Sequence, residues 1–426
     1  MGDSDRDYRR DFYRALNVHQ GAQMLSEEEE FERYYVPIYA QFDGPAGPDL
    51  VAEIATAIDF TAGGSVQLLS GYRGAGKTTE LLRLKRELDR EVYLPVYFDI
   101  EDYFNPELPL EAATFLVGLA AGFVDNCEEI DGLKHNLYRR VQTFFQRLNI
   151  DAELSASVSG GSASLDLRAT LRDDESFRAQ VKKALESNRK TFKEEMHAFF
   201  NDLENSLPGN TPPVFIVDSI DHYRGRSSTF DEVRDSVEAL FSHYASELAL
   251  PGMHVVYTVP VYVKPTGWGG EVWPVLNVKV RERSGEDCQE GIDLLRQVLA
   301  KRAPNGDVER LLGVETDRVI RASGGLFRDL FRLVAGLLLK NGPLPVRPED
   351  VDQVERQQRS QAVAGLTQEQ WEILRQVKET QQLIVPRELT SEAWTLQALG
   401  YVLCYRNGTV DWWGVNPLLE PLLDED

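Results

Sequence analysis

A glycine-rich turn between an apolar run and a helical run is the part of this sequence that indicates a chemistry. Residues 68–84 read LLSGYRGAGKTTELLRL. The spacing GxxxxGK[ST] is satisfied in full by Gly71, Gly76, Lys77 and Thr78. Glycines at this spacing let successive backbone amides face a concavity, and the helix start adds the positive end of its dipole. The stretch predicts a phosphate-binding loop, and the alternative is a glycine-rich turn with a surface lysine.

The loop residues have separate expected roles. Lys77 is expected to reach the terminal phosphates of a nucleotide, and Thr78 to ligate Mg²⁺. The full set of predicted phosphate contacts is Gly71, Tyr72, Arg73, Gly74, Ala75, Gly76, Lys77, Thr78 and Thr79.

A carboxylate follows a later apolar run. In PPVFIVDSID the chain runs into Asp218, which we assign as the carboxylate that holds Mg²⁺ through water. The next residue, Ser219, cannot activate water for hydrolysis. Asp221, beside His222, is the nearest acid and the candidate for that task, although it suits a turn or a cap equally well.

Two further positions could sense a terminal phosphate. Thr258 stands near the end of the apolar run HVVYTVP, where a hydroxyl needs a polar partner, either phosphate-bound water or neighbouring backbone. Arg328 and Arg332 are four residues apart in SGGLFRDLFRLV, so both face one side of a helix. Arg328 is the preferred candidate for the phosphates, with surface ion pairing as the competing role.

The order of the elements predicts an α/β fold. Apolar runs at 66–70, 92–100, 213–218 and 254–260 are separated by helical stretches, which is typical of a doubly wound parallel sheet. Between the second and third runs, ELSASVSGGSASLDLRATL alternates around Gly160 and Gly161 and predicts a β-hairpin. A charged helical segment over 174–206 follows, and its mixed signs favour a solvated face over a nucleic-acid surface.

Beyond residue 285 the pattern is helical, and the chain closes with helix, helix and a hairpin, YVLCYRNGTVDWWGV, turning at Asn407-Gly408. That order resembles a winged helix-turn-helix. We expect an arm over 1–45, an ATPase domain over 46–284 with an insertion at about 150–206, a helical lid over 285–363 and the winged-helix-like module over 364–426.

Composition and charge limit the partners. The 426 residues suggest two to four domains. With 46 basic and 69 acidic residues, the net charge is −23, and this field opposes binding to nucleic acid. The three cysteines are far apart and indicate buried thiols in the cytoplasm rather than disulfides or a zinc site. No apolar run is long enough for a membrane span.

Taken in order, the loop, the VFIVDSID and VVYTVP runs, SGGLFRDL and the terminal module resemble the AAA+ P-loop ATPases, in the STAND and origin-initiator-like branch. The resemblance implies an ATP/Mg²⁺ site with Thr258 as sensor 1 and Arg328 as sensor 2. It also implies that Tyr35, Val36 and Pro37 line the adenine pocket, although a hydrophobic clasp for the arm is an equal alternative.

Departures from the family pattern favour a slow switch over a motor. Ser219 stands where the second acid is usual, and LFSHYASELALPGM lacks the arginine that such rings usually supply, with Arg224 and Arg226 as substitutes nearby. The expected function is an ATP-controlled switch that governs assembly with itself or a partner protein, as in bacterial defence or signalling. The alternative is a DNA-associated initiator or loader, and a metabolic kinase fits least.

Charge in the terminal module separates the first two functions. Residues 364–426 hold four basic residues against ten acidic ones, and TSEAWTLQAL, the candidate second helix, has no Arg or Lys. A helix that approaches DNA phosphates cannot easily carry that balance. Trp394, Trp412 and Trp413 suit protein contact or packing on the ATPase body, so we expect oligomerisation, autoinhibition or partner docking.

Overall fold

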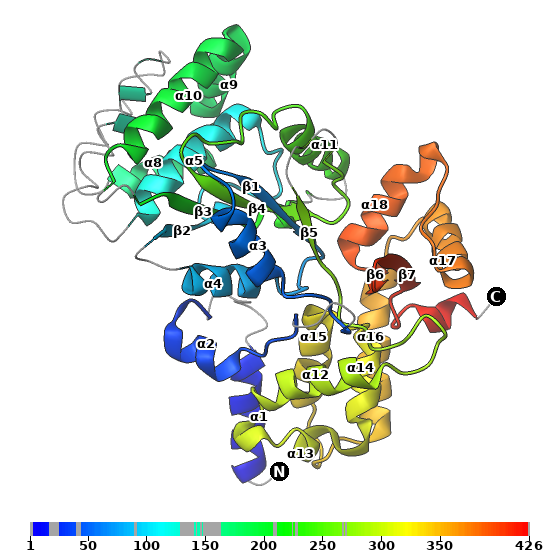
Figure 1. The fold of residues 1–426 in the computed structure, drawn as a ribbon. Helices are drawn as coiled ribbons and strands as arrows, with labels where there is room; N and C mark the ends of the chain where they lie inside the picture. Colours follow the sequence, from blue (N-terminus) through cyan, green and yellow to red (C-terminus); the bar gives the residue numbers. More distant parts are fainter. Residues whose placement is uncertain are drawn as a thin grey trace. The chain divides into compact units, whose positions relative to one another are not determined.

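The computed structural model describes residues 3–16, 25–39, 44–88, 92–127, 163–207, 211–223, 229–265 and 271–424, with isolated positions at 140, 141, 143, 144, 147, 225 and 268 (Figure 1). The chain divides into two compact units. The first unit comprises Met1–Leu50, Gly71–Glu80 and Val275–Asp426, and the second comprises Val51–Ser70 and Leu81–Pro274.

A five-stranded parallel sheet forms the centre of the α/β fold, in the order β2-β3-β4-β1-β5 (Figure 1). The strands are β1 (Val66–Gly71), β2 (Leu94–Asp99), β3 (Pro213–Asp218), β4 (His254–Pro260) and β5 (Val272–Val275). Every residue of β3 and β4 is buried, as expected for interior strands of a parallel sheet. The predicted α/β class and the four predicted strands are confirmed.

The fifth strand was not predicted from the sequence. β5 has four residues, includes Pro274, and is buried only at its last position. It lies at the edge of the sheet, where a proline is tolerated although it has no backbone N–H to donate. A run this short and this exposed gives little periodic signal.

Helices precede and separate the strands along the chain. They are α3 (Leu50–Asp59), α4 (Lys77–Glu87), α5 (Ala112–Asn126), α8 (Ala163–Asp173), α9 (Glu175–Ser187), α10 (Arg189–Glu204) and α11 (Phe230–Ser242). Helix α4 begins in the first unit and continues into the second from Leu81. In α5 every residue from Ala112 to Asp125 is buried, which confirms the predicted apolar helix. Gly118 and Gly122 let the rings of Phe104 and Phe98 approach, because a Cβ there would lie 2.3 Å from each ring.

The predicted hairpin around Gly160 and Gly161 is wrong for its second half. The residues after 162 form helix α8, and residues 150–162 lie outside the described part of the chain. Ala163–Asp173 is rich in Ala, Leu and Arg, which are strong helix formers, and local alternation did not outweigh that propensity. Within the same insertion, the charged segment 174–206 forms two helices, α9 and α10. The backbone leaves the helical conformation at Asn188, whose side chain caps the start of α10.

The regular elements described in the first unit are mainly helices. Its helices are α1 (Asp3–Leu16), α2 (Glu28–Tyr34), α12 (Gln289–Ala300), α13 (Glu309–Leu312), α14 (Thr316–Ala322), α15 (Phe327–Leu338), α16 (Pro348–Val363), α17 (Gln368–Thr380) and α18 (Thr390–Leu399). The arm packs on α15, where the buried guanidinium of Arg9 donates to the carbonyls of Leu337 and Leu338. The positive charge of Arg9 is stabilised at these carbonyls by the negative, C-terminal end of the α15 dipole.

The C-terminal module has the predicted order of helix, helix and hairpin. β6 (Val402–Asn407) pairs antiparallel with β7 (Val410–Val415), and Gly408 turns between them with φ of 57°. Its core consists of Ile373, Leu374, Val377, Ala393, Leu396, Val402, Val415 and Leu419. The hairpin is confirmed, and its turn follows from the tolerance of glycine for positive φ.

The remaining expectations concern cysteines and membrane spans. Cys127, Cys288 and Cys404 are buried free thiols, as predicted. Across the ranges that the structure describes, none of the helices combines the length and apolar character needed to cross a membrane.

Candidate functional site: a glycine loop and a carboxylate edge

The predicted phosphate loop follows β1 directly and requires its glycines. Gly74 and Gly76 have φ of 87° and 100°, in the left-handed region that favours glycine. Gly71 is extended, but a Cβ there would lie 2.6 Å from the carbonyl oxygen of Val275. The turn therefore tolerates no side chain at these three positions.

Lys77 begins α4 and is buried within the loop. Its side chain is 4% exposed, and Nζ donates to the carbonyls of Gly71 at 2.9 Å and Tyr72 at 2.8 Å. A surface lysine is thereby excluded. Burying an ammonium group is costly unless it is hydrogen-bonded, and these two carbonyl oxygens are acceptors that hold it at the loop. The arrangement fits an anionic ligand at this loop.

The other loop positions differ in exposure. Tyr72 and Ala75 are buried, whereas Arg73, Thr78 and Thr79 are partly exposed. Thr78 and Thr79 lie in the first turn of α4, where backbone N–H groups have no partner within the helix. This helix start, with its positive dipole end, is the second feature that fits an anion.

A tyrosine that the sequence analysis did not select fixes the loop from the arm. Tyr39 is 1% exposed, and its hydroxyl lies 3.2 Å from the carbonyl oxygen of Ala75 and 3.1 Å from that of Leu276. The signal was present in the aromatic stretch ERYYVPIYAQF. Tyr35 stacks on Phe31, another residue of the arm, with ring centroids 4.7 Å apart.

The two other members of the predicted adenine pocket follow Tyr35 in the chain. Val36 is partly exposed and Pro37 is exposed.

Helix α15 approaches the loop at Gly74. The backbone N–H of Arg328 donates to the Gly74 carbonyl at 3.3 Å, and a Cβ on Gly74 would lie 2.4 Å from the Arg328 Cβ. The Arg328 guanidinium donates to the carbonyl of Leu399 at 3.4 Å. Burial lowers the pKa of Arg332, and the positive charges of Arg328 and Arg73 lower it further. Arg73 and Arg328 thus lie close enough to Arg332 for their charges to act on it.

In the second unit, Asp218 ends β3 as a buried carboxylate. It is 1% exposed, with Oδ1 accepting from the backbone N–H of Ser219 at 2.6 Å and Oδ2 from the hydroxyl of Tyr97 at 2.7 Å. Ser219 has φ of 71°, a left-handed conformation that is strained for a residue with a side chain. Such strain concentrates at functional sites, so this turn supports the assignment of Asp218 to a site.

Asp99 is a second carboxylate that the sequence analysis missed. It ends β2 in register with Asp218, and its side chain accepts from the backbone N–H of Glu101 at 3.0 Å. Burial and the neighbouring charge of Asp218 raise the pKa of Asp99 to about 6. The signal was the apolar run VYFD, which ends in an acid just as FIVD does.

Thr258 ties β4 to the turn after Asp218. It is fully buried, and its Oγ1 accepts from the backbone N–H of Ile220 at 3.0 Å. This is the neighbouring-backbone partner named as the alternative to phosphate-bound water. The contact fixes the start of the short helix η4 (Ile220–His222).

Asp221 lies in η4 with a side chain that is 3% exposed. Its Oδ2 is 3.9 Å from Nε2 of His222, whose Nδ1 is 2.9 Å from Oε1 of Glu101. The imidazole therefore bonds to Glu101 and lies near the carboxylate of Asp221, its neighbour in the chain. Arg224 and Arg226 lie outside the described residues.

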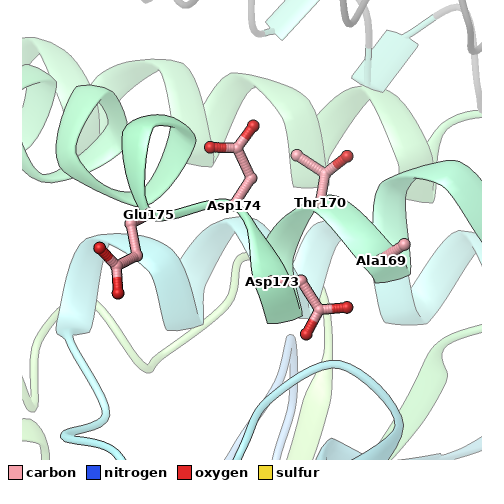
Figure 2. A pocket seen from close by; sticks show the side chains of 5 residues that line it. All are labelled: Ala169, Thr170, Asp173, Asp174 and Glu175. Carbon is pink, nitrogen blue, oxygen red and sulfur yellow. The ribbon is translucent and has the colours of Figure 1, made fainter.

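A shallow pocket elsewhere in the second unit does not suit phosphate. Figure 2 shows its lining, Ala169, Thr170, Asp173, Asp174 and Glu175. Three of these five side chains are carboxylates, and Asp174 already caps α9 by accepting from the backbone N–H of Phe177. Anionic walls repel a phosphate, so the glycine loop is the better candidate site.

Neither metal-ligand geometry nor comparison with known proteins narrows the function of this site further. Within the described ranges, no group of three His, Cys, Asp or Glu side chains is arranged to hold a metal ion. Searches with protein-family models and among curated proteins find no match to this chain.

Proposed function

We propose that this protein is an ATP/Mg²⁺-dependent switch of the AAA+ type, in the STAND and origin-initiator-like branch, with slow hydrolysis. The observation that carries the proposal is the turn after β1. Three of its positions exclude side chains, and Lys77 is buried at the start of an 11-residue helix. Backbone amides, a helix dipole and a buried cation together form a binding site for the phosphates of a nucleotide.

The roles of the chain's own residues follow from this assignment. The loop amides bind the phosphates, and Lys77 neutralises their charge. Thr78 and Asp218 are proposed to hold the magnesium ion, which supplies further neutralisation of the phosphate oxygens when bound. Arg328, whose backbone meets Gly74, is proposed to bind the terminal phosphate.

Slow hydrolysis is proposed because water activation is poorly provided. Ser219 follows Asp218, and both oxygens of Asp218 accept hydrogen bonds from nearby groups. Asp221 remains the candidate for polarising water, and its carboxylate is largely enclosed. A site that binds a triphosphate tightly and hydrolyses it slowly is suited to holding one of two states.

A protein partner is proposed in preference to DNA. In the C-terminal module, α18 carries no basic side chain, and Arg406 is ion-paired with Asp411 at 2.6 Å across the hairpin. The ion pair neutralises one of the few cations that could approach a DNA phosphate. We therefore propose that the switch controls self-association or docking of a partner protein, with a role in bacterial defence or signalling.

The test is size-exclusion chromatography with light scattering, on wild type and Lys77→Ala, with and without ATP and Mg²⁺. A mass change that needs both ATP and Lys77 supports the switch. A fixed mass with rapid, Lys77-dependent hydrolysis would favour an ordinary enzyme, and wild type that binds no nucleotide would overturn the proposal.

A further inference from the structure

The C-terminal module contacts the same short segment that meets the phosphate loop. The hydroxyl of Tyr405, on β6, donates to the carbonyl of Gly324 at 2.7 Å. The side-chain amide of Asn416, just after β7, donates to Oδ2 of Asp329 at 3.0 Å and to the carbonyl of Gly400 at 2.9 Å. Both side chains are about 5% exposed or less, so these are buried polar contacts.

Glycines make these contacts possible. Gly324 has φ of 59°, and a Cβ there would lie 2.5 Å from Leu403. Gly400 has φ of 74°, and its Cβ would lie 3.2 Å from Nη2 of Arg328. The first approach brings β6 onto the start of α15, and the second brings the end of α18 to the Arg328 guanidinium.

Asp329 competes for that guanidinium. Nε of Arg328 is 3.5 Å from Oδ1 of Asp329, a long and weak contact, while Oδ2 of the same carboxylate is taken by Asn416. Asp329 is 8% exposed, and a buried carboxylate without its amide donor would draw closer to the nearest cation. Asn416 thus holds one oxygen of Asp329, while the other oxygen makes only a long contact with Arg328.

We propose that Asn416 and Tyr405 are positioning residues for nucleotide recognition. They hold the Gly324–Asp329 turn so that Arg328 stays at Gly74, where its guanidinium is proposed to bind the terminal phosphate. The inference rests on the proposed nucleotide site and adds to it a dependence on the C-terminal module. Its consequence is that the module sets the preference for ATP over ADP, since only ATP carries the phosphate that Arg328 is proposed to bind.

The experiment measures dissociation constants of the full-length chain for ATP and ADP with Mg²⁺ in wild type, Asn416→Ala and Tyr405→Phe. We expect Asn416→Ala to weaken ATP binding about tenfold, as for a lost buried hydrogen bond to a charged group, and to leave ADP binding within about twofold. Tyr405→Phe keeps the ring and should give a smaller loss of the same kind. Arg406→Ala, on the same strand but paired with Asp411, is the matched control and should keep the wild-type ratio.

A double variant separates positioning from general destabilisation. If Asn416 acts through Arg328, then Arg328→Ala with Asn416→Ala should bind ATP no more weakly than Arg328→Ala alone. Additive losses, or equal weakening of ATP and ADP, would overturn the inference and leave the nucleotide site standing. Failure of wild type to bind either nucleotide would overturn the nucleotide site and this inference with it.

Discussion

Asp99 and Asp218 end two neighbouring parallel strands in the same register, so two carboxylates stand side by side at one edge of the sheet. Asp218 is almost fully buried, and the pKa of Asp99 is raised to about 6 by burial and by Asp218. Like charges this close cost folding free energy unless a proton or a cation lies between them. The repulsion between these two carboxylates therefore destabilises the folded state.

We predict that Asp99→Asn stabilises the protein at pH 7.5 by about 3 kcal/mol, the free-energy equivalent of raising the Asp99 pKa from 3.8 to about 6. The folded pKa lies above the unfolded value of 3.8, so the folded state binds the proton more tightly. Stability from this group is thus present below about pH 4 and is lost as the pH rises to about 6. Urea denaturation of both proteins over this range measures the difference, which should vanish near pH 4. A variant less stable than wild type at pH 7.5 would contradict the prediction.

Lys77→Ala should abolish nucleotide binding, because the substitution removes the cation held at the loop. Isothermal titration with ATP and Mg²⁺ measures the loss, expected to exceed about a hundredfold. Lys301→Ala, which removes an exposed lysine of the same unit, is the control and should bind as wild type does. Equal binding by Lys77→Ala and wild type would remove the loop from consideration as the phosphate site.

Gly74→Ala should destabilise the first unit and weaken ATP binding together. The new Cβ would lie 2.4 Å from the Arg328 Cβ, in a backbone conformation that alanine rarely adopts. Gly47→Ala is matched to it, with φ of 97° but no atom within 4 Å of the added Cβ. We expect about 1 kcal/mol of destabilisation for Gly47→Ala and at least 1 kcal/mol more for Gly74→Ala, by thermal denaturation. Equal losses in the two variants would show that α15 moves away from the added Cβ without a loss of stability.

Asp221→Ala should spare nucleotide binding and suppress hydrolysis, because the carboxylate is the candidate for polarising water. Phosphate release under single-turnover conditions measures the rate, with an expected loss of about a hundredfold. Asp235→Ala, an acid on α11 paired with Arg234, serves as the control. Normal hydrolysis by Asp221→Ala would mean that another acid, with Asp99 the first to examine, activates the water.

The protein should not bind duplex DNA at physiological salt. Net charge in the C-terminal module is negative, and Arg406 is already paired with Asp411. Fluorescence anisotropy with a labelled duplex at about 0.15 M salt measures this. Retained binding that Arg387→Ala or Arg406→Ala abolishes would instead favour the initiator-type function.

The sequence by itself determined the elements that depend on local pattern. Continuous apolar runs predicted four of the five strands, since buried strands need little beyond their own residues to be recognised. Asn407-Gly408 predicted the C-terminal hairpin, because only a few residues tolerate its turn. Glycine spacing predicted the loop, and the close approach of Val275 to Gly71 and the positive φ of Gly76 give the physical reasons for the two glycines of the motif.

Tertiary structure decided everything that depends on partners distant in the chain. Asp99 became a neighbour of Asp218 only through strand register, and Thr258 found its partner in the backbone of Ile220. The predicted hairpin at Gly160 failed beyond residue 162, because alternation in a short segment does not outweigh helix propensity. Lys77 was recognisable from its motif, but its burial against backbone carbonyls required the folded loop, since burial is a property of the packed chain.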